Sequence, residues 1–162
     1  MPKNPDEKPK IIHIHGDQTM LDQVRAKWEE LNHYHCDRSE HFKQHYLAMT
    51  WQKRKYTLLK KASGGAMYVD IAINSSSHYP VGYVIGSVNA EKTGEIESIY
   101  VDVEYRGIGI GDKLIKEALA WMDQNGAISK QVEVSVGNEV AWKFYGRYGF
   151  LPRKTLLKQV KK

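Results

Sequence analysis

The sequence YVDVEYRGIGIGDKL, residues 100–114, decides the fold of this 162-residue chain. A run rich in valine leads into Arg106 and three alternating glycines, and these lead directly into an amphipathic helical pattern. This order of strand, glycine loop and helix is typical of a phosphate site. The backbone N–H groups of the glycines are unshielded, and the start of the helix carries roughly half a positive charge. The stretch therefore predicts a phosphate-bearing ligand.

Spacing narrows the identity of that ligand. A dinucleotide site needs a glycine or alanine three residues after Gly109, where this chain has Asp112. A triphosphate loop ends in Gly-Lys-Ser/Thr, and no such ending follows. The pattern that remains is Arg106-x-x-Gly109-x-Gly111, preceded by Val101.

A second informative segment lies about thirty residues downstream. It reads NEVAWKFYGRYGF, residues 138–150, and it follows the run VEVSV, residues 132–136. Asn138 is a good N-cap, and apolar residues recur behind it at helical spacing. Gly149 stands where a left-handed C-cap belongs. The segment predicts a short helix packed against the strand before it.

The two segments, in this order, resemble the two hallmark motifs of the GNAT superfamily of N-acetyltransferases. The resemblance implies that acetyl-CoA is the co-substrate and that Val101 and Val103 pair with its pantetheine arm, with the Val101 N–H facing the thioester oxygen. Asp112 departs from the pattern, because a carboxylate at the end of the loop repels a pyrophosphate unless it points away. The implied cofactor-binding residues are Val101, Val103, Arg106, Gly107, Ile108, Gly109, Ile110, Gly111, Asp112, Asn138 and Tyr145.

The resemblance also implies the fold, an α/β (α+β) domain of the GNAT type. Its mixed, mostly antiparallel sheet has six to seven strands flanked by helices, in the order βααβββαβαβ. We expect one domain over residues 11–162, after a disordered polar lead-in of residues 1–10. Periodicity and turn residues predict strands at 11–15, 66–74, 81–89, 95–103, 132–136 and 154–160. They predict helices at 19–34, at 39–62 with a break near residue 50, from the glycine loop to residue 124, and from residue 138.

Acetyl transfer to an amine needs a base for the ammonium proton and an acid for the departing thiolate. Tyr145 occupies the tyrosine position of the second hallmark, which makes it the candidate acid. Glu95 and Glu97 share one strand face just upstream of the glycine loop, and Glu133 lies on the next predicted strand. The resemblance ranks Glu97 first as the base, then Glu133, then Glu95. For each of them the alternative is an ordinary strand-edge carboxylate.

The acceptor is expected to be a primary amine, on a small molecule or on a protein. Its pocket is expected between the helices of residues 19–62, which carry Trp28, Tyr34, Tyr46 and Trp51. Cys36 lies away from both hallmarks, so direct attack in a ternary complex is expected rather than an acyl-enzyme. Two alternatives remain, a catalytically silent CoA-binding regulatory domain and a basic interaction module. A homodimer is left open.

Composition excludes several other classes. No apolar run approaches the ~18 residues that span a membrane, and a single cysteine is compatible with a reducing cytoplasm. The net charge of +5 comes from residues 153–162, and the rest of the chain carries 19 basic and 19 acidic residues, which argues against a nucleic-acid surface. No recognised metal spacing joins the early histidines, so no metal is expected. These residues are His33, His35, Cys36, His41 and His45.

Overall fold

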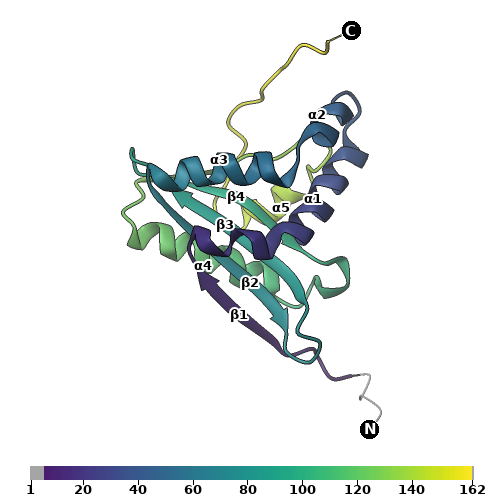
Figure 1. The fold of residues 1–162 in the computed structure, drawn as a ribbon, viewed down its shortest axis with the longest axis vertical. Coiled ribbons are helices and arrows are strands. Elements are labelled where there is room, and N and C mark those ends of the chain that lie inside the picture. Colours follow the sequence, from purple (N-terminus) through teal and green to yellow (C-terminus); the bar gives the residue numbers. More distant parts are fainter. Residues whose placement is uncertain (1–5, 162) are drawn as a thin grey trace.

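A five-stranded sheet forms the centre of the computed structural model, which describes residues 6–161 (Figure 1). Its strands lie side by side in chain order. Adjacent strands among the first four are antiparallel, and the fifth strand is parallel to the fourth. They are β1 (Ile11–Gly16), β2 (Ala66–Asn74), β3 (Pro80–Val88), β4 (Thr93–Val101) and β5 (Ser129–Val132).

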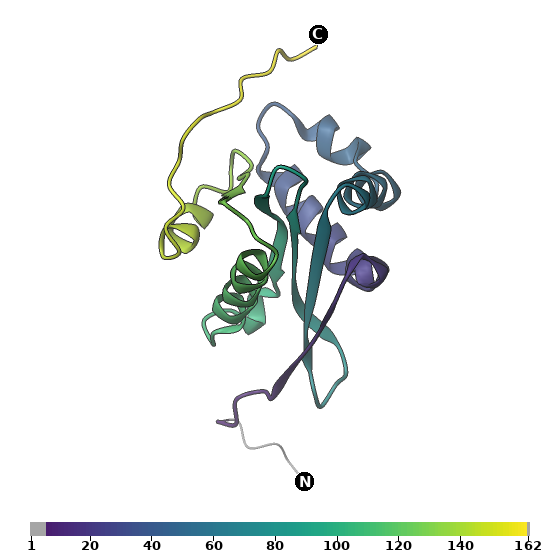
Figure 2. The same ribbon diagram turned by 90° about the vertical axis from the view of Figure 1, so that its left-hand side faces the viewer.

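Helices cover both faces of this sheet (Figure 2). One face carries η1 (Gln18–Val24), α1 (Arg25–Arg38), α2 (Lys43–Ala48) and α3 (Trp51–Ser63). The other face carries α4 (Ile110–Gln124) and α5 (Ala141–Gly146), and the short turn η2 (Val103–Tyr105) follows β4.

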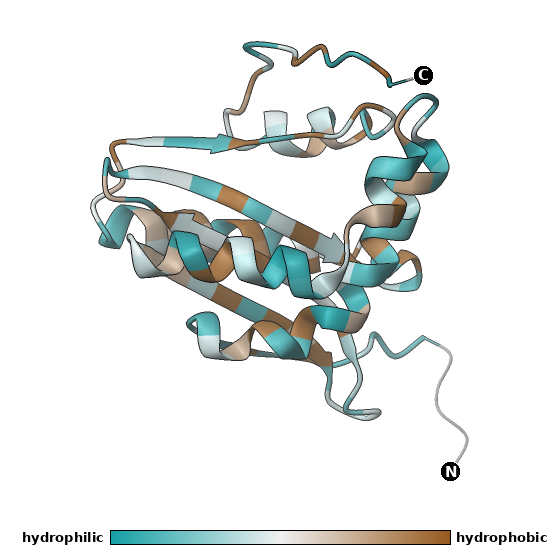
Figure 3. Cartoon of the chain, turned by 45° about the horizontal axis from the view of Figure 1, so that its top comes forward, coloured by the Kyte–Doolittle hydropathy of each residue, from teal (hydrophilic) through white to brown (hydrophobic). Residues whose placement is uncertain are grey.

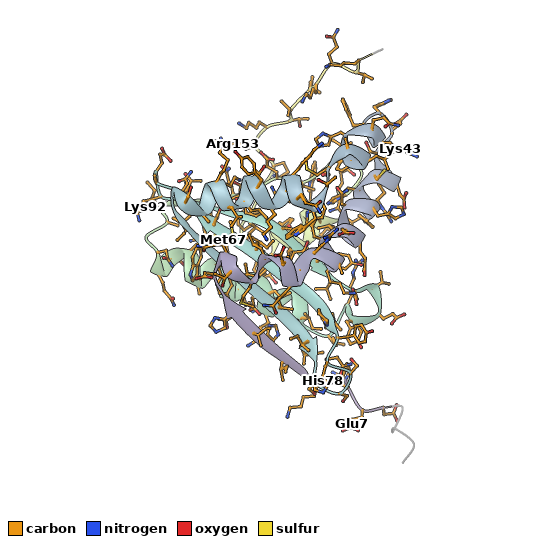
Figure 4. All side chains as sticks on the ribbon, in the orientation of Figure 1. Glu7, Lys43, Met67, His78, Lys92 and Arg153 are labelled. Carbon is orange, nitrogen blue, oxygen red and sulfur yellow. The ribbon has the colours of Figure 1, made fainter. Side chains whose placement is uncertain are left out.

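Alternation along the strands produces two apolar cores, one on each face. In β2, Val69 and Ile71 face α1 and α3, whereas Tyr68 and Ala72 face α4. Met67 belongs to the first core and lies among the side chains beneath α3 (Figure 4). The hydropathy colouring shows the same pattern, with apolar bands along the strands between polar helix surfaces (Figure 3). Because helices cover both faces of the sheet, the sheet is a rigid support. The site lies at the C-terminal ends of β4 and β5.

The sheet has five strands in the described residues, so the expected six to seven is wrong. Residues 154–160 form no strand. They belong to an exposed terminal segment, residues 151–161, which includes Arg153 and extends away from the sheet (Figures 2 and 4). A strand needs a neighbour for its backbone groups, and this segment pairs with none of the described strands. The observed order also has three α-helices before β2 and ends on α5, unlike βααβββαβαβ.

Other boundaries also differ from the expectations. The fifth strand spans Ser129–Val132 instead of residues 132–136, and the fourth ends at Val101 instead of 103. The first helix begins as a 3₁₀ turn and continues to Arg38. The last helix begins at Ala141, because residues 138–140 form a turn in which the Ala141 N–H bonds the Asn138 carbonyl.

The expected lead-in of residues 1–10 lies partly outside the described residues. Residues 6–10 precede β1 and are exposed. Among the described residues, no helix combines the length and the apolar character that a membrane span requires.

The buried tyrosines predict a loss of stability at alkaline pH. Burial raises the pKa of Tyr145 to about 12, and burial also raises the pKa of the fully buried Tyr83 well above its usual value. An unfolded chain ionises its tyrosines near pH 10, so this stability is complete below about pH 10 and is lost as the pH rises through the folded pKa values. We expect the free energy of unfolding to fall above about pH 10 by up to about 1.4 kcal/mol per pH unit for each such tyrosine.

Urea unfolding between about pH 8 and 11 measures this slope. Tyr83→Phe should flatten it, whereas Tyr79→Phe, at an exposed position in the β2–β3 turn, should leave it unchanged. A Tyr83→Phe slope equal to that of the wild type would contradict the expectation.

Candidate active site

A bulge in β4 creates the opening in which the site lies. Ile85 of β3 pairs with Ser98, but the next residue, Gly86, pairs with Ile96, so Glu97 is an extra residue in β4. The parallel pairing of β4 with β5 stops at Ile96 and Val132, one residue before the bulge. Because a bulge bends its strand, β4 and β5 separate beyond this point. This separation also explains why residues 133–136 form no strand.

A cleft of about 280 Å³ occupies the space between the separated strands. Residues 96–99 of β4 form one wall, residues 132–135 form the other, and Tyr145 and Asn138 also border it. The side towards α1 and α2 is formed by Trp28, Leu31, Asn32, His35, His45, Tyr46 and Met49.

Backbone groups of β4 point into this opening. The Asp102 N–H donates to the Val81 carbonyl of β3, at 2.9 Å. Because consecutive residues of a strand direct their N–H and C=O groups to opposite sides, those of Ile99 and Val101 point away from β3. Val103 lies beyond the strand in η2, and its carbonyl accepts the Arg106 N–H. For the predicted pairing of a pantetheine arm, the Val101 N–H is available, whereas the Val101 carbonyl already accepts the Arg106 side chain and Val103 is part of a turn.

The glycine loop has the geometry of an anion cradle. Gly107 and Gly109 have φ values of 79° and 93°, which side chains rarely adopt, and the space where their Cβ atoms would lie is empty. Gly111 lies against α5, and a Cβ added there would be 3.4 Å from the Phe144 ring, which is an ordinary contact distance. The open space at Gly107 and Gly109 leaves the backbone of the loop accessible to a ligand.

The start of α4 is available to an anion. Gly109 is its N-cap and supplies no side chain, and no side-chain cap hydrogen bond forms there among residues 6–161. Ile110 is buried and anchors the first turn, while Ile108 is 40% exposed. This arrangement fits the diphosphate that CoA carries.

Asp112 points away from the loop, which removes the expected conflict with a pyrophosphate. Its carboxylate accepts the Tyr148 hydroxyl and forms an ion pair with Lys116 at 2.9 Å. These two bonds, first that from Tyr148 and then that from Lys116, lower the pKa of Asp112, so it is ionised but already paired.

Arg106 closes the end of β4. Its Nε donates to the Val101 carbonyl at 2.8 Å, and its guanidinium lies 5.7 Å from the centre of the Tyr100 ring. The side chain is exposed beside the glycine loop, where its charge adds to that of the α4 start.

Tyr145 is a buried proton donor without a partner in the described chain. Its side chain borders the cleft, is 8% exposed, and makes no hydrogen bond with residues 6–161. Burial raises the pKa of its hydroxyl to about 12, so Tyr145 is protonated at neutral pH. Its ring is held between Phe144 and Phe150, with centroids 5.3 and 6.1 Å away. Asn138 lies on the same border and accepts the Tyr34 hydroxyl at 3.4 Å rather than capping α5.

The three glutamates have very different surroundings. Glu133 is exposed, lines the cleft and has no hydrogen bond or ion pair with the described residues. Glu97 and Glu95 share the α3 face, as predicted, and both bind Lys61. The Glu97 side chain is only 2% exposed and also binds Arg54 and Ser87. The structure thus brings Glu133 and Tyr145 to one cleft and directs the Glu97 carboxylate towards α3.

The acceptor side partly matches the expected aromatic pocket. Trp28 and Tyr46 line the cleft, but Trp51 borders a separate hollow between α1 and α2. His35 also lines the cleft, and its Nδ1 is buried without a partner in the described chain. Burial, and to a lesser extent Arg38, lower its pKa, so it is neutral.

Sequence reasoning missed Arg54, which lines the cleft from α3. In the sequence it stands between Lys53 and Lys55, in a basic run that is typical of a solvated helix face. The available signal was its spacing from Lys61, seven residues later, which places both charges on one helix face. Among residues 6–161, no group of histidine, cysteine, aspartate or glutamate side chains is arranged to hold a metal ion.

Comparison with known proteins finds N-acetyltransferases of similar sequence. An uncharacterised N-acetyltransferase of Methanocaldococcus jannaschii is 31% identical over 114 residues, which are 67% of this chain and 49% of that protein. N-alpha-acetyltransferase 30 of Schizosaccharomyces pombe is 41% identical over 63 residues, 39% of this chain and 42% of the relative. The chain spans about half the length of the curated relatives it matches.

Solved structures share the fold. A GCN5-related N-acetyltransferase from Ralstonia eutropha has a TM-score of 0.71 at 19% identity, over 93% of this chain and 99% of that one. AAC(6′)-Iy, in complex with the bisubstrate analogue CoA-S-monomethyl-acetylneamine, has a TM-score of 0.62 at 17% identity, over 94% and 99% of the two chains. Residues 28–150 match the model of the acetyltransferase (GNAT) family. With both hallmark segments, the bulged sheet and this match, the chain belongs to the GNAT family of acetyltransferases.

Proposed function

We propose that this chain transfers the acetyl group of acetyl-CoA to a primary amine, which attacks the thioester directly while both substrates are bound. Acetyl-CoA supplies the activated acyl group. The amine nitrogen bonds to the carbonyl carbon, the C–S bond breaks, and an amide and a free thiol result. The acceptor is a small-molecule amine or an amine of a protein, reached from the α1–α2 side of the cleft.

The observation that carries the proposal is the unpartnered hydroxyl of Tyr145 in the cleft between β4 and β5. A buried phenol with a pKa of about 12 is protonated at neutral pH, so its O–H is available as a hydrogen-bond donor. Negative charge develops on the CoA sulfur as the C–S bond breaks, and Tyr145 stabilises this charge by donating to the sulfur. The free Val101 N–H, pointing into the same opening, supports the role of donor to the thioester oxygen.

Glu133 is the base that the geometry favours over Glu97. Its carboxylate is unpaired within the described chain and borders the cleft. Glu97, by contrast, accepts bonds from Lys61 at 2.7 Å and from Ser87 at 2.7 Å, so its oxygens are already occupied. An alkylamine is protonated at neutral pH, and Glu133 accepts the proton it must lose, directly or through a water.

The test measures thiol release from acetyl-CoA with a panel of small amines, polyamines, amino acids and peptides. With an accepted amine, Glu133→Gln should lower kcat by about 100-fold, because a general base contributes at least that factor. The control Glu91→Gln, at an exposed position in the β3–β4 turn, should not change kcat. If Glu97→Gln alone removed the pH dependence of kcat, Glu97 would be the base instead.

Thiol release from none of the amines, despite tight binding of acetyl-CoA by calorimetry, would contradict the proposal. It would favour the silent CoA-binding domain.

A further inference from the structure

A cluster of four charged side chains joins α3 to β4 behind the cleft. Arg54 and Lys61 of α3 meet Glu95 and Glu97 of β4, where α3 crosses the sheet (Figure 1). Lys61 lies 2.7 Å from Glu97 and 3.0 Å from Glu95, and Arg54 lies 3.4 Å from Glu97. Two positive charges thus meet two negative charges, and the central Glu97 side chain is nearly inaccessible to solvent.

The cluster bonds the backbone of the bulge as well as its side chain. Arg54 Nη2 donates to the Glu97 main-chain carbonyl at 2.8 Å and also reaches the Glu97 carboxylate. An inserted bulge residue has no ladder partner opposite it, and an unpaired buried carbonyl is costly. The guanidinium of Arg54 therefore donates a hydrogen bond to the Glu97 carbonyl, which has no partner in the neighbouring strand.

The bulge determines which backbone groups face the cleft. Glu97 and Ser98 both lie on the α3 side, since Ser98 bonds the Tyr83 hydroxyl at 2.7 Å within that core. Without the inserted residue, every later residue of β4 would move by one position relative to β3, and its side chain and N–H would change sides. The N–H groups of Ile99 and Val101 would then point into the sheet instead of the opening.

From this we propose that the Arg54–Lys61–Glu95–Glu97 cluster is a clamp that holds the β4 bulge in register. Arg54 is accordingly a positioning residue, which acts on acetyl transfer through the Val101 backbone. The inference rests on the proposed function for its effect on the reaction, but not for its effect on β4. A buried ion pair often adds little net stability compared with an apolar replacement, and in some proteins buried polar groups instead select one register over another, which is the role that we assign to this cluster.

The test uses Arg54→Met and, in case an unpaired Glu97 prevents folding, the double variant Arg54→Met/Glu97→Gln. Lys60→Met, one residue before Lys61 and exposed, is the control. Hydrogen exchange is followed at the Ser98, Tyr100 and Asp102 amides, which pair with β3, and at the amides of β2. We expect exchange about tenfold faster at the three β4 amides and unchanged in β2, because only the register of β4 is released.

Steady-state kinetics give the second measurement. The KM for acetyl-CoA should rise about tenfold in both Arg54 variants, with the pH midpoint of kcat unchanged, because the backbone donors are misplaced while the proton-transfer groups are retained. Arg54→Lys should keep the ion pair with Glu97 but bring the KM for acetyl-CoA only part of the way back to the wild-type value. A lysine ammonium lacks the planar guanidinium that binds the Glu97 carbonyl and carboxylate together.

Exchange rates equal to those of the wild type, or raised equally in β2 and β4, would overturn the clamp. If the wild-type protein did not bind acetyl-CoA, the proposed function would fail, and hydrogen exchange alone would still decide the clamp.

Discussion

Arg106→Glu is expected to weaken acetyl-CoA binding by about 100-fold or more, equivalent to about 2.7 kcal/mol. The substitution replaces a positive charge beside the glycine loop with a negative one, at a site whose attraction depends on the start of α4 and on Arg106 together. It also removes the bond to the Val101 carbonyl, which holds the end of β4. Titration calorimetry with acetyl-CoA at low salt measures the effect.

The control for this experiment is Lys60→Glu, which changes the net charge by the same amount on the exposed side of α3. A general electrostatic effect would weaken binding in both variants, whereas a local one weakens it only in Arg106→Glu. Unchanged affinity in Arg106→Glu would mean that the loop does not hold the diphosphate, and the cofactor assignment would be lost.

Tyr145→Phe should lower kcat by about 100-fold while the KM for acetyl-CoA changes little. Only the hydroxyl is removed, and it makes no hydrogen bond to another described side chain, so packing against Phe144 and Phe150 is retained. A general acid contributes about 10²–10⁴-fold, and a thiolate can still leave slowly without one, which favours the lower end of that range. Because the Tyr145 pKa is about 12, the wild-type rate should not fall on the alkaline side through loss of this proton below about pH 11.

Stopped-flow or steady-state thiol detection between about pH 6 and 10 measures the loss. Tyr79→Phe, at an exposed turn, serves as the matched control. Full activity of Tyr145→Phe at every pH would exclude the hydroxyl as the acid, and a large rise in KM alone would make it a binding group.

Much of the local structure could be predicted because it depends on neighbours in the sequence. The loop before α4 follows from glycines that alone adopt its backbone angles, and α4 ends at Asn125-Gly126, as expected from their turn preference. Strand β2 was predicted at its observed bounds from a continuous run of β-formers ending in a serine turn. Each signal lies within about ten residues of the structure it specifies.

Contacts between distant segments could not be predicted in this way. Glu97 looks like any strand carboxylate in sequence, and only the packing of α3 against β4 shows that Arg54 and Lys61 neutralise it. The bulge itself is a mismatch between two strands, so neither strand predicts it alone. The same limit explains the failed strand at residues 154–160: a β-type pattern specifies a preference, but a strand forms only where a neighbour accepts its hydrogen bonds.

The sequence by itself determined the glycine loop before α4, the two hallmark segments and the family to which they belong. These properties follow from residue types at short, fixed spacing, such as the positive φ that Gly107 and Gly109 permit. Tertiary structure alone decided that Glu133 and Tyr145 share a cleft, that Asp112 turns away from the loop, and that Glu97 is held by α3. The reason is physical: a side chain's chemistry depends on burial, charge and partners, and partners can come from distant segments, as Tyr148 does for Asp112 and Lys61 for Glu97, each 36 residues away in the chain.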